Sequence, residues 1–143
     1  MEERFADNYL LYLLARASTE VSKQFHSRLK HHGLQVSEWR VLASLSDGDG
    51  MTVGELAARA LQRQPTMTKI VGRMEISGLV QRRKSSRDRR RVQVFITDDG
   101  RQRVSAALKD AIEHEAEVLS DYTRKEAADL KTILRNLLER NGA

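Results

Sequence analysis

A cluster of cations is the part of this sequence best suited to chemistry. Residues 82–91 read RRKSSRDRRR, so seven of the ten side chains are Lys or Arg and only Asp88 is acidic. Guanidinium and ammonium groups donate charge-assisted hydrogen bonds to phosphate oxygens. The runs on either side, 78–82 and the alternating 92–97, are typical of short strands. We therefore expect a β-hairpin whose charged tip contacts an anionic partner.

The positive charge is concentrated in the middle third of the chain. Residues 51–97 hold 11 Lys or Arg against 3 Asp or Glu, whereas residues 1–50 hold 6 against 7 and residues 98–143 hold 8 against 10. The formal net charge of +5 therefore comes from one segment between nearly neutral flanks. This distribution is typical of a nucleic-acid-binding module held by a scaffold that does not contact the phosphates.

Composition narrows the class of protein. A chain of 143 residues that is 40% hydrophobic is expected to form a single domain, 1–143, and one proline among long periodic stretches favours a mainly α-helical fold. No apolar run has the length of a membrane span, and the acidic start, MEERF, differs from a basic leader. A cytoplasmic protein without membrane contact is expected. The absence of cysteine excludes disulfides, thiolate metal sites and thiol redox switches.

The sequence offers no arrangement of catalytic side chains. Its histidines are His26, His31, His32 and His114, and none has a metal-ligand spacing or a nucleophile beside it. The stretch 114–117, HEAE, lacks the second histidine of a zinc-protease helix. We therefore expect a protein that is not an enzyme, with no catalytic residue, no metal and no cofactor.

Two helices are predicted before the basic segment. Apolar residues at three- and four-residue steps indicate one long amphipathic helix over 5–31, which Gly33 ends. Ser37 and Glu38 are expected to open a second helix, and the DGDG stretch at 47–50 closes it.

Two short helices are predicted next. Thr52 and Glu55 have the spacing of a capping box, which starts a helix over 53–60. Pro65 fits the first turn of a helix that runs to Gly78. Two helices joined by a brief turn and followed by a basic hairpin, the only β structure expected, have the order of a winged helix-turn-helix. The alternative is an unrelated α+β domain.

Two further helices are predicted after the hairpin, over 98–122 and from residue 123 or 124 to residue 140. Together with the helix over 5–31, they carry more apolar surface than a small DNA-binding core covers. Packing against a second copy is the simplest explanation, because symmetric dimers are the commonest closed oligomers. The alternative is packing within one chain alone.

The order of elements and two motifs resemble the multiple antibiotic resistance regulator (MarR) family of winged-helix regulators, over nearly the whole chain. Residues 88–90 match that family's D-x-R wing signature, and ITDDG at 96–100 matches its L/I-T-x-x-G sequence. The run 65–80 resembles the family's recognition helix and its exit into the wing. Neither motif identifies the operator.

The resemblance implies a winged helix-turn-helix part, 34–100, and long dimerisation helices within 5–33 and 101–141. It implies an obligate homodimer on double-stranded DNA, with recognition helix 65–77 in the major groove and wing 82–92 in the minor groove. The residues expected to contact DNA are Gln62, Gln64, Thr66, Thr68, Lys69, Arg73, Arg87, Asp88, Arg89, Arg90 and Arg91.

Two wing residues have particular expected roles. Arg90, the arginine of the D-x-R match, is expected to insert into the minor groove, where the negative potential is focused. Asp88 is unfavourable near phosphate, so we expect it to pair with an arginine and fix the conformation of the tip.

The resemblance also implies a ligand pocket, because family members often hold a small molecule between the dimerisation helices and the winged part. Aromatic and cationic side chains there suit a small aromatic acid or an acyl-CoA thioester. The candidate ligand-binding residues are Arg16, Phe25, His26, His32, Trp39 and Arg40. The other interpretation is that the aromatic residues belong to the core and the arginines to surface ion pairs. Without cysteine, the thiol-oxidation mechanism of the family's peroxide-sensing branch is excluded.

The sequence therefore predicts a homodimeric, ligand-responsive transcriptional regulator on a pseudopalindromic operator, which we expect to be a repressor. An activator is an alternative, and so is a constitutive, nucleoid-type architectural DNA-binding protein without an effector. No residue pattern identifies the operator, the regulated genes or the effector.

Overall fold

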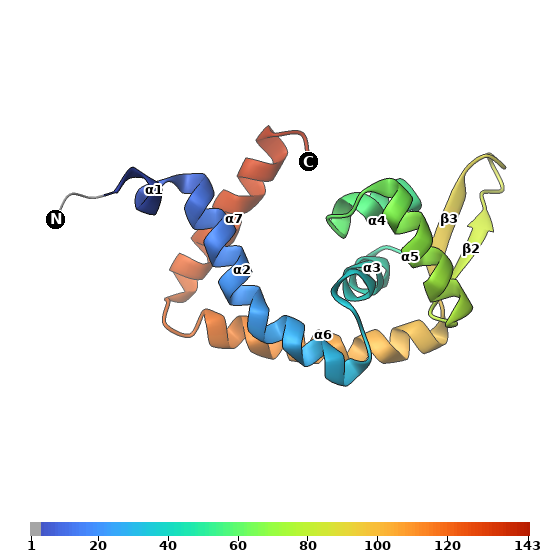
Figure 1. Ribbon diagram of the computed structural model, residues 1–143, viewed down its shortest axis with the longest axis horizontal. Coiled ribbons are helices and arrows are strands. Elements are labelled where there is room, and N and C mark those ends of the chain that lie inside the picture. Colours follow the sequence, from blue (N-terminus) through green and yellow to red (C-terminus); the bar gives the residue numbers. More distant parts are fainter. Residues whose placement is uncertain (1–3) are drawn as a thin grey trace. The chain divides into compact units, whose positions relative to one another are not determined.

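The computed structural model describes residues 4–143 as a mainly helical protein with one small antiparallel sheet (Figure 1). The elements, in chain order, are α1 Phe5–Asn8, α2 Leu10–Leu29, the 3-10 turn η1 Lys30–His32, α3 Val36–Asp47, β1 Met51–Thr52, α4 Val53–Arg59, α5 Gln64–Ile76, β2 Val80–Lys84, β3 Val92–Ile96, α6 Asp98–Val118 and α7 Arg124–Arg140. The predicted fold class is confirmed.

The chain divides into two compact units, the first ending at Asp110 and the second comprising Ala111–Ala143. Helix α6 runs from the first unit into the second. The first unit holds the helix-turn-helix elements and the whole sheet. The functional division predicted from the sequence, with boundaries near residues 34 and 100, stays a prediction.

The first helix differs from the prediction of one continuous element over 5–31. It is interrupted at Tyr9, whose extended backbone has φ −77° and ψ 127°. Asn8 precedes the break, and asparagine has a low helix propensity. At its other end α2 tightens into η1 and stops at Gly33, whose φ of +66° lies in the left-handed region. The spacing of the apolar residues predicts which side of the helix is apolar. It does not predict the break, because a single residue with an extended backbone does not alter that spacing.

The helices α3 and α4 begin at local capping signals. Helix α3 starts at Val36, before the predicted Ser37, and the Glu38 carboxylate accepts a hydrogen bond of 2.8 Å from the Gln35 N–H. Before α4, the Glu55 N–H donates to Thr52 Oγ1 at 3.2 Å and the Thr52 N–H donates to Glu55 Oε2 at 3.3 Å. This capping box is the predicted one.

The sheet contains a strand that the sequence did not predict. Strand β1 pairs with β3 in the register Met51 to Val94, and the strand order is β1-β3-β2. Two residues are too few to show the alternation by which strands are recognised. Asp49 holds the preceding loop to β3, because its carboxylate accepts a 2.9 Å hydrogen bond from the Ile96 N–H. The hairpin is therefore not the only β structure.

The last two helices meet at a short turn. Helix α6 ends at Val118, before the predicted residue 122, and the Tyr122 N–H donates to the Leu119 carbonyl at 3.1 Å. Thr123 then caps α7, accepting a 3.1 Å hydrogen bond from the Glu126 N–H. The predicted bounds of α7 are confirmed.

One core supports both DNA-binding elements expected from the sequence. Apolar side chains of α3, α4, α5, the hairpin and the start of α6 are fully buried. They include Val41, Leu42, Leu45, Leu56, Met67, Val71, Met74, Val80, Val94, Val104 and Ala107. Because α5 and the root of the hairpin share this core, burial of apolar surface fixes the two relative to each other.

The corner between β3 and α6 explains the I-T-x-x-G sequence. Thr97 Oγ1 donates a 2.6 Å hydrogen bond to the Gly78 carbonyl and accepts one of 3.0 Å from the Gly100 N–H. The Thr97 N–H donates to the Leu79 carbonyl at 3.1 Å. A Cβ at Gly100 would overlap the Leu79 carbonyl oxygen and lie 2.9 Å from Ile96 Cγ1. Only glycine allows this approach of α6 to the chain leaving α5.

Gly100→Ala is therefore expected to lower the free energy of unfolding by about 1–3 kcal/mol, the usual effect of overpacking a close contact. Urea unfolding at fixed protein concentration measures it. The matched control is Gly72→Ala in α5, where an added Cβ meets no atom within 4 Å. Helix propensity predicts that this control gains up to about 1 kcal/mol. Equal effects of the two substitutions would contradict the packing explanation.

Candidate nucleic-acid interface

Helix α5 separates apolar from polar side chains. Met67, Ile70, Val71 and Met74 are buried. The predicted DNA-contacting residues of the helix all lie on the exposed surface. They are Gln64, Thr66, Thr68, Lys69 and Arg73. This division follows the helical period, since residues three and four apart share a face. The helix therefore presents hydroxyl, amide and cationic groups to solvent on one side.

The turn between α4 and α5 is tied to α3. The half-buried Gln62 donates from Nε2 to Ser37 Oγ at 2.9 Å, and Arg40 donates from its guanidinium to the Ala60 carbonyl at 3.3 Å. Leu61 has a positive φ of 57° and is 75% exposed. Gln62 was predicted to contact DNA. In the structure its amide nitrogen links the turn to α3, and the DNA contact stays a prediction.

Backbone hydrogen bonds shape the wing tip. The Ser85 N–H donates to the Arg91 carbonyl at 2.8 Å, and the Arg91 N–H donates to the Asp88 carbonyl at 3.0 Å. The Asp88 carboxylate accepts a 3.0 Å hydrogen bond from the Arg90 backbone N–H. We predicted that Asp88 would pair with an arginine and fix the conformation of the tip. Its partner is Arg90, and the contact is made through the backbone N–H of that residue rather than its guanidinium.

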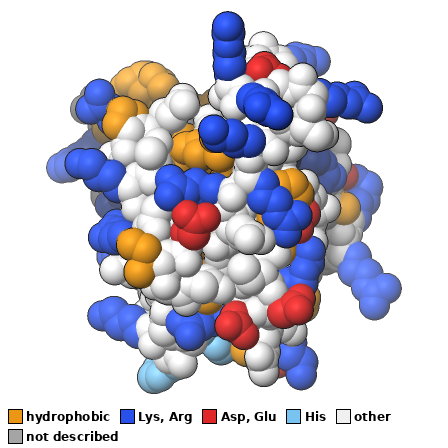
Figure 2. All heavy atoms as spheres, turned by 90° about the vertical axis from the view of Figure 1, so that its right-hand side faces the viewer, with side chains coloured by type: hydrophobic (Ala, Val, Ile, Leu, Met, Phe, Trp, Pro, Cys, Tyr) orange, Lys and Arg blue, Asp and Glu red, His pale blue; other side chains and the backbone are white. Residues whose placement is uncertain are grey.

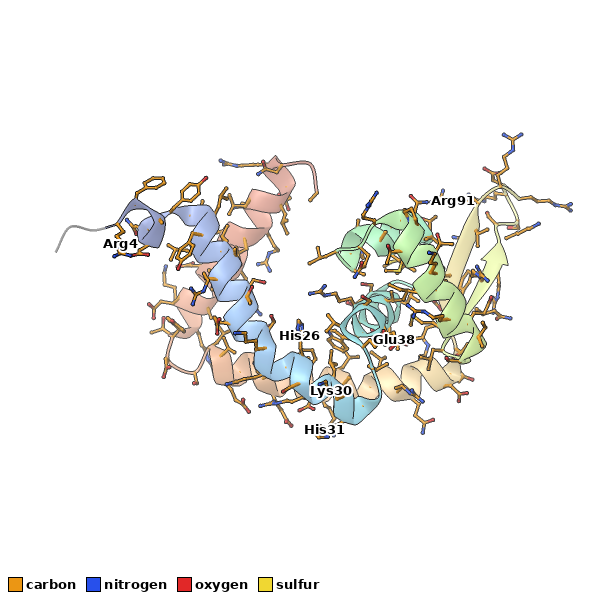
Figure 3. The ribbon with its side chains drawn as sticks, viewed as in Figure 1. Arg4, His26, Lys30, His31, Glu38 and Arg91 are labelled. Carbon is orange, nitrogen blue, oxygen red and sulfur yellow. The ribbon has the colours of Figure 1, made fainter. Side chains whose placement is uncertain are left out.

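Three wing cations are engaged within the protein. The Arg82 guanidinium donates to Glu75 Oε1 at 2.9 and 3.0 Å, and that of Arg83 lies 4.7 Å from the centroid of the Phe95 ring. Arg91 reaches back to Glu55 of α4 at 3.3 Å (Figure 3). Each contact offsets part of the repulsion among neighbouring like charges.

The remaining wing cations project into solvent. Within residues 4–143, the structure gives no ion pair or hydrogen bond to the side chains of Lys84, Arg87, Arg89 or Arg90, and all four residues are exposed. We define these four as the tip cations. Three of them were predicted to contact DNA. Lys84 was missed, although its place at the end of β2 next to the tip could have indicated it.

Two hollows flank the exposed face of α5. One is lined by Thr66, Lys69, Arg73 and Arg82 together with Gly72, Glu75 and Ile76. The other lies between the starts of α4 and α5 and the wing, and Gln64, Thr68, Arg90 and Arg91 are among its lining residues. Figure 2 shows this side of the molecule with many Lys and Arg side chains and few acidic ones. The hollows therefore lie on a surface where cationic side chains outnumber acidic ones.

The predicted ligand residues only partly come together. The Phe25 and Trp39 rings are in edge contact, with centroids 5.1 Å apart and planes at 68°. His26, beside them on α2 (Figure 3), has its ring centroid 6.4 Å from that of Phe25. Phe25 is buried and Trp39 half-buried, so these rings contribute to the core at the end of α2.

The other three predicted ligand residues have separate partners. Arg16 donates to the Tyr12 hydroxyl at 3.1 Å on its own helix, and Arg40 is held by the Ala60 carbonyl. His32 Nε2 lies 2.8 Å from Asp110 Oδ2, and the Arg28 guanidinium lies 3.6 Å from Asp110 Oδ1. These contacts lower the pKa of Asp110, with the His32 hydrogen bond as the main cause and the Arg28 charge as a smaller one.

Two kinds of feature are absent from the described part of the chain. Across residues 4–143, no three His, Cys, Asp or Glu side chains are grouped so that they hold a metal ion. None of the helices described is long and apolar enough to cross a membrane.

The chain is similar in sequence and in structure to known transcriptional regulators. Residues 32–91 match the sequence model of the MarR family. A MarR family transcriptional regulator from Silicibacter pomeroyi DSS-3 is 44% identical to this chain, with a TM-score of 0.85, over 96% of this chain and 98% of that one. The transcriptional repressor CouR, solved bound to a 23-mer DNA duplex, is 26% identical with a TM-score of 0.81, over 96% of this chain and 99% of that one.

Curated relatives are also regulators by name. The homoprotocatechuate degradative operon repressor of Escherichia coli is 27% identical over 129 residues, which are 90% of this chain and 87% of that protein. The transcriptional regulator TtmR of Methylorubrum extorquens strain PA1 is 33% identical over 95 residues. That alignment covers 66% of this chain and 49% of TtmR, so the chain spans about half the length of that relative.

The contact between His32 and Asp110 predicts a pH-dependent stability. The pKa of the Asp110 carboxyl group is lower in the folded chain than its ordinary value of 3.8. The carboxylate therefore stabilises the fold when the pH is above 3.8, and this contribution is lost as the pH falls through the lowered pKa. Asp110→Asn is therefore expected to reduce the melting temperature clearly at about pH 7 and much less at about pH 3.

Thermal unfolding of both proteins across this range tests the prediction. Asp129→Asn is the control, because Asp129 pairs only with the highly exposed Lys125 on the surface of α7 and surface pairs contribute little. A loss in Asp110→Asn that is the same at neutral and acid pH would contradict the assignment.

Proposed function

The chain belongs to the MarR family of transcriptional regulators, and from this premise we propose that it is a homodimeric, ligand-responsive repressor that binds a pseudopalindromic DNA operator. The family and the relatives compared above are regulators of transcription, so the prediction that the chain is not an enzyme is confirmed. A regulator acts where the DNA is, and the proposal therefore includes a cytoplasmic location.

One observation carries the proposal of DNA binding. The exposed polar face of α5 and the four tip cations belong to a single basic surface on one core. A B-DNA major groove is wide enough for an α-helix, and the narrower minor groove concentrates negative potential that attracts arginine. Helix and wing are therefore suited to adjacent grooves. CouR, which has the same fold, was solved bound to a DNA duplex, and this supports the proposal of DNA binding.

The proposed contacts divide into two kinds. Lys69 and Arg73 on α5 have the reach to bind phosphate or a guanine edge, while Thr66 and Thr68 hydrogen-bond bases or backbone. Arg90 inserts into the minor groove, and the other tip cations contact the flanking phosphates. Phosphate contacts set orientation and general affinity, whereas base contacts set the operator sequence.

Dimer formation is proposed from exposed apolar side chains. On α1 and α2, Phe5, Leu10, Leu11 and Leu13 are exposed. On α7, the apolar stripe is exposed at four positions, which are Leu130, Ile133, Leu134 and Leu138. Apolar stripes of this kind favour burial against another surface, and a second copy provides it. A symmetric pair would present two recognition helices to two half-sites of a pseudopalindrome.

The proposed effector is an aromatic acid or an acyl-CoA thioester. Phe25, His26 and Trp39 form an aromatic group at the end of α2, which suits a planar ligand. The operon named in the E. coli relative degrades homoprotocatechuate, and this supports an aromatic compound. Arg16, His32 and Arg40 have protein partners, so an effector that uses them must displace or share those contacts.

Fluorescence anisotropy tests the proposed function. At about 150 mM salt, we expect a duplex from the region upstream of the gene to bind at least about a thousandfold more tightly than a scrambled duplex. One member of a panel of aromatic acids and their CoA thioesters should release it. Equal binding of both duplexes, with no effect of any compound, would instead indicate an architectural DNA-binding protein.

The double substitution Ile133→Glu, Leu138→Glu is expected to give a folded monomer, because both side chains are 58% exposed in the single chain and charges there disfavour burial. Sedimentation should give the 16.3 kDa mass of one chain for this variant and twice that for the unaltered protein. Thr132→Glu, on the polar side of α7, is the control and should remain dimeric. A dimer that survives the double substitution would exclude this surface.

A further inference from the structure

All three acidic residues of the basic segment act on the wing. Residues 51–97 contain Glu55, Glu75 and Asp88 as their only carboxylates. Asp88 accepts from the backbone of the tip, while Glu75 and Glu55 each hold an arginine at one end of the wing. A carboxylate near DNA phosphates opposes binding by Coulomb repulsion. Its presence there therefore calls for a structural explanation.

Glu75 makes the most extensive of these contacts. It lies in the last turn of α5, and its two oxygens receive three hydrogen bonds from Arg82 of β2. The Arg82 backbone N–H donates to Oε2 at 2.8 Å, and the guanidinium Nε and Nη2 donate to Oε1 at 3.0 and 2.9 Å. The backbone hydrogen bond, followed by the guanidinium, lowers the pKa of Glu75.

These hydrogen bonds join the two elements that are proposed to enter DNA. One end of the link is in α5, close to Lys69 and Arg73, and the other is in the strand that leads directly to Lys84 and the tip. Because one bond involves the Arg82 backbone, the carboxylate fixes the course of β2 as well as a side chain. A guanidinium that holds two bonds to one carboxylate is also withdrawn from phosphate.

A second contact restrains the other side of the wing. Arg91 immediately precedes β3 and pairs with Glu55 of α4 at 3.3 Å. Both side chains are about half exposed, so this pair is weaker than the Glu75 link. The hairpin is therefore held at both strands, more firmly at β2.

We propose that Glu75, acting through Arg82, is a positioning residue for DNA binding that sets the angle of the wing relative to recognition helix α5. The link lets the tip cations meet the minor groove while α5 lies in the adjacent major groove. This inference rests on the proposed DNA-binding function. Arg82, although it belongs to the basic cluster, acts in the protein and does not contact phosphate.

The sign of one mutational effect tests the proposal. Neutralising a carboxylate on a DNA-facing surface raises the local positive charge and should strengthen binding, unless the carboxylate positions other groups. For Glu75→Gln we expect the opposite, a loss of specific affinity of about fivefold to tenfold, the size of a charge-assisted hydrogen bond at a partly exposed site. Asp98→Asn, which removes an exposed carboxylate at the start of α6, is the matched control and should not weaken binding.

A double-mutant cycle separates positioning from phosphate contact. Glu75→Gln, Arg82→Gln and the double variant should all lose about the same affinity, because each breaks one coupled link. Arg82→Gln should keep the salt dependence of binding, whereas Arg89→Ala should reduce the slope by about one. Additive effects, with Glu75→Gln binding more tightly than the unaltered protein, would overturn the inference.

Chemical footprinting of the DNA distinguishes a displaced wing from a general loss of protein stability. In the Glu75→Gln complex at saturating protein, hydroxyl-radical protection of the flanking minor grooves should weaken, while protection of guanine N7 in the major groove remains. Circular dichroism checks that the variant is folded. Uniform weakening of both protections would refute a role in wing placement.

The two proposals fail in different ways. If the unaltered protein does not distinguish its own upstream duplex from a scrambled one, the proposed regulator function fails. If the unaltered protein binds specifically and Glu75→Gln binds as well or better, DNA binding stands and only the positioning role of Glu75 fails.

Discussion

Repulsion among like charges in the wing is the constraint on which much of this structure depends. Seven cations within ten residues destabilise any fixed conformation of that segment. Three of them are held by a carboxylate or an aromatic ring, two along β2 and one just before β3, and the other four remain exposed at and beside the tip. The strands of the wing are therefore held in place, whereas its tip carries exposed positive charge.

The core that holds the root of the wing also holds helix α5. The root of the hairpin and the inner face of α5 belong to one buried core, and the corner at Thr97 and Gly100 brings α6 against the chain between them. Hydrogen bonds from α3 to the turn before α5 brace the same unit. Helix and wing therefore share one packed core, which suits the proposed contact with two adjacent grooves.

Local signals made much of this fold predictable. Thr52 with Glu55, Pro65 and the Thr97 to Gly100 corner act within a few residues, so the sequence alone identifies them. Strand β1 depends on a partner that is distant in the chain, the break at Tyr9 on the backbone angles of one residue, and the Glu75 link on where β2 passes the end of α5. The candidate pocket residues were selected by type, and type does not reveal that His32 already has Asp110 as its partner.

The strand order has a further consequence for solubility. Strand β2 is one of the two outer strands of the sheet, and after Val80 its side chains Gln81, Arg82, Arg83 and Lys84 are all exposed. An open edge strand invites pairing with strands of other molecules, and positive charges along it prevent such association. The same cations that suit the wing to DNA thus keep copies of the protein from joining edge to edge into aggregates.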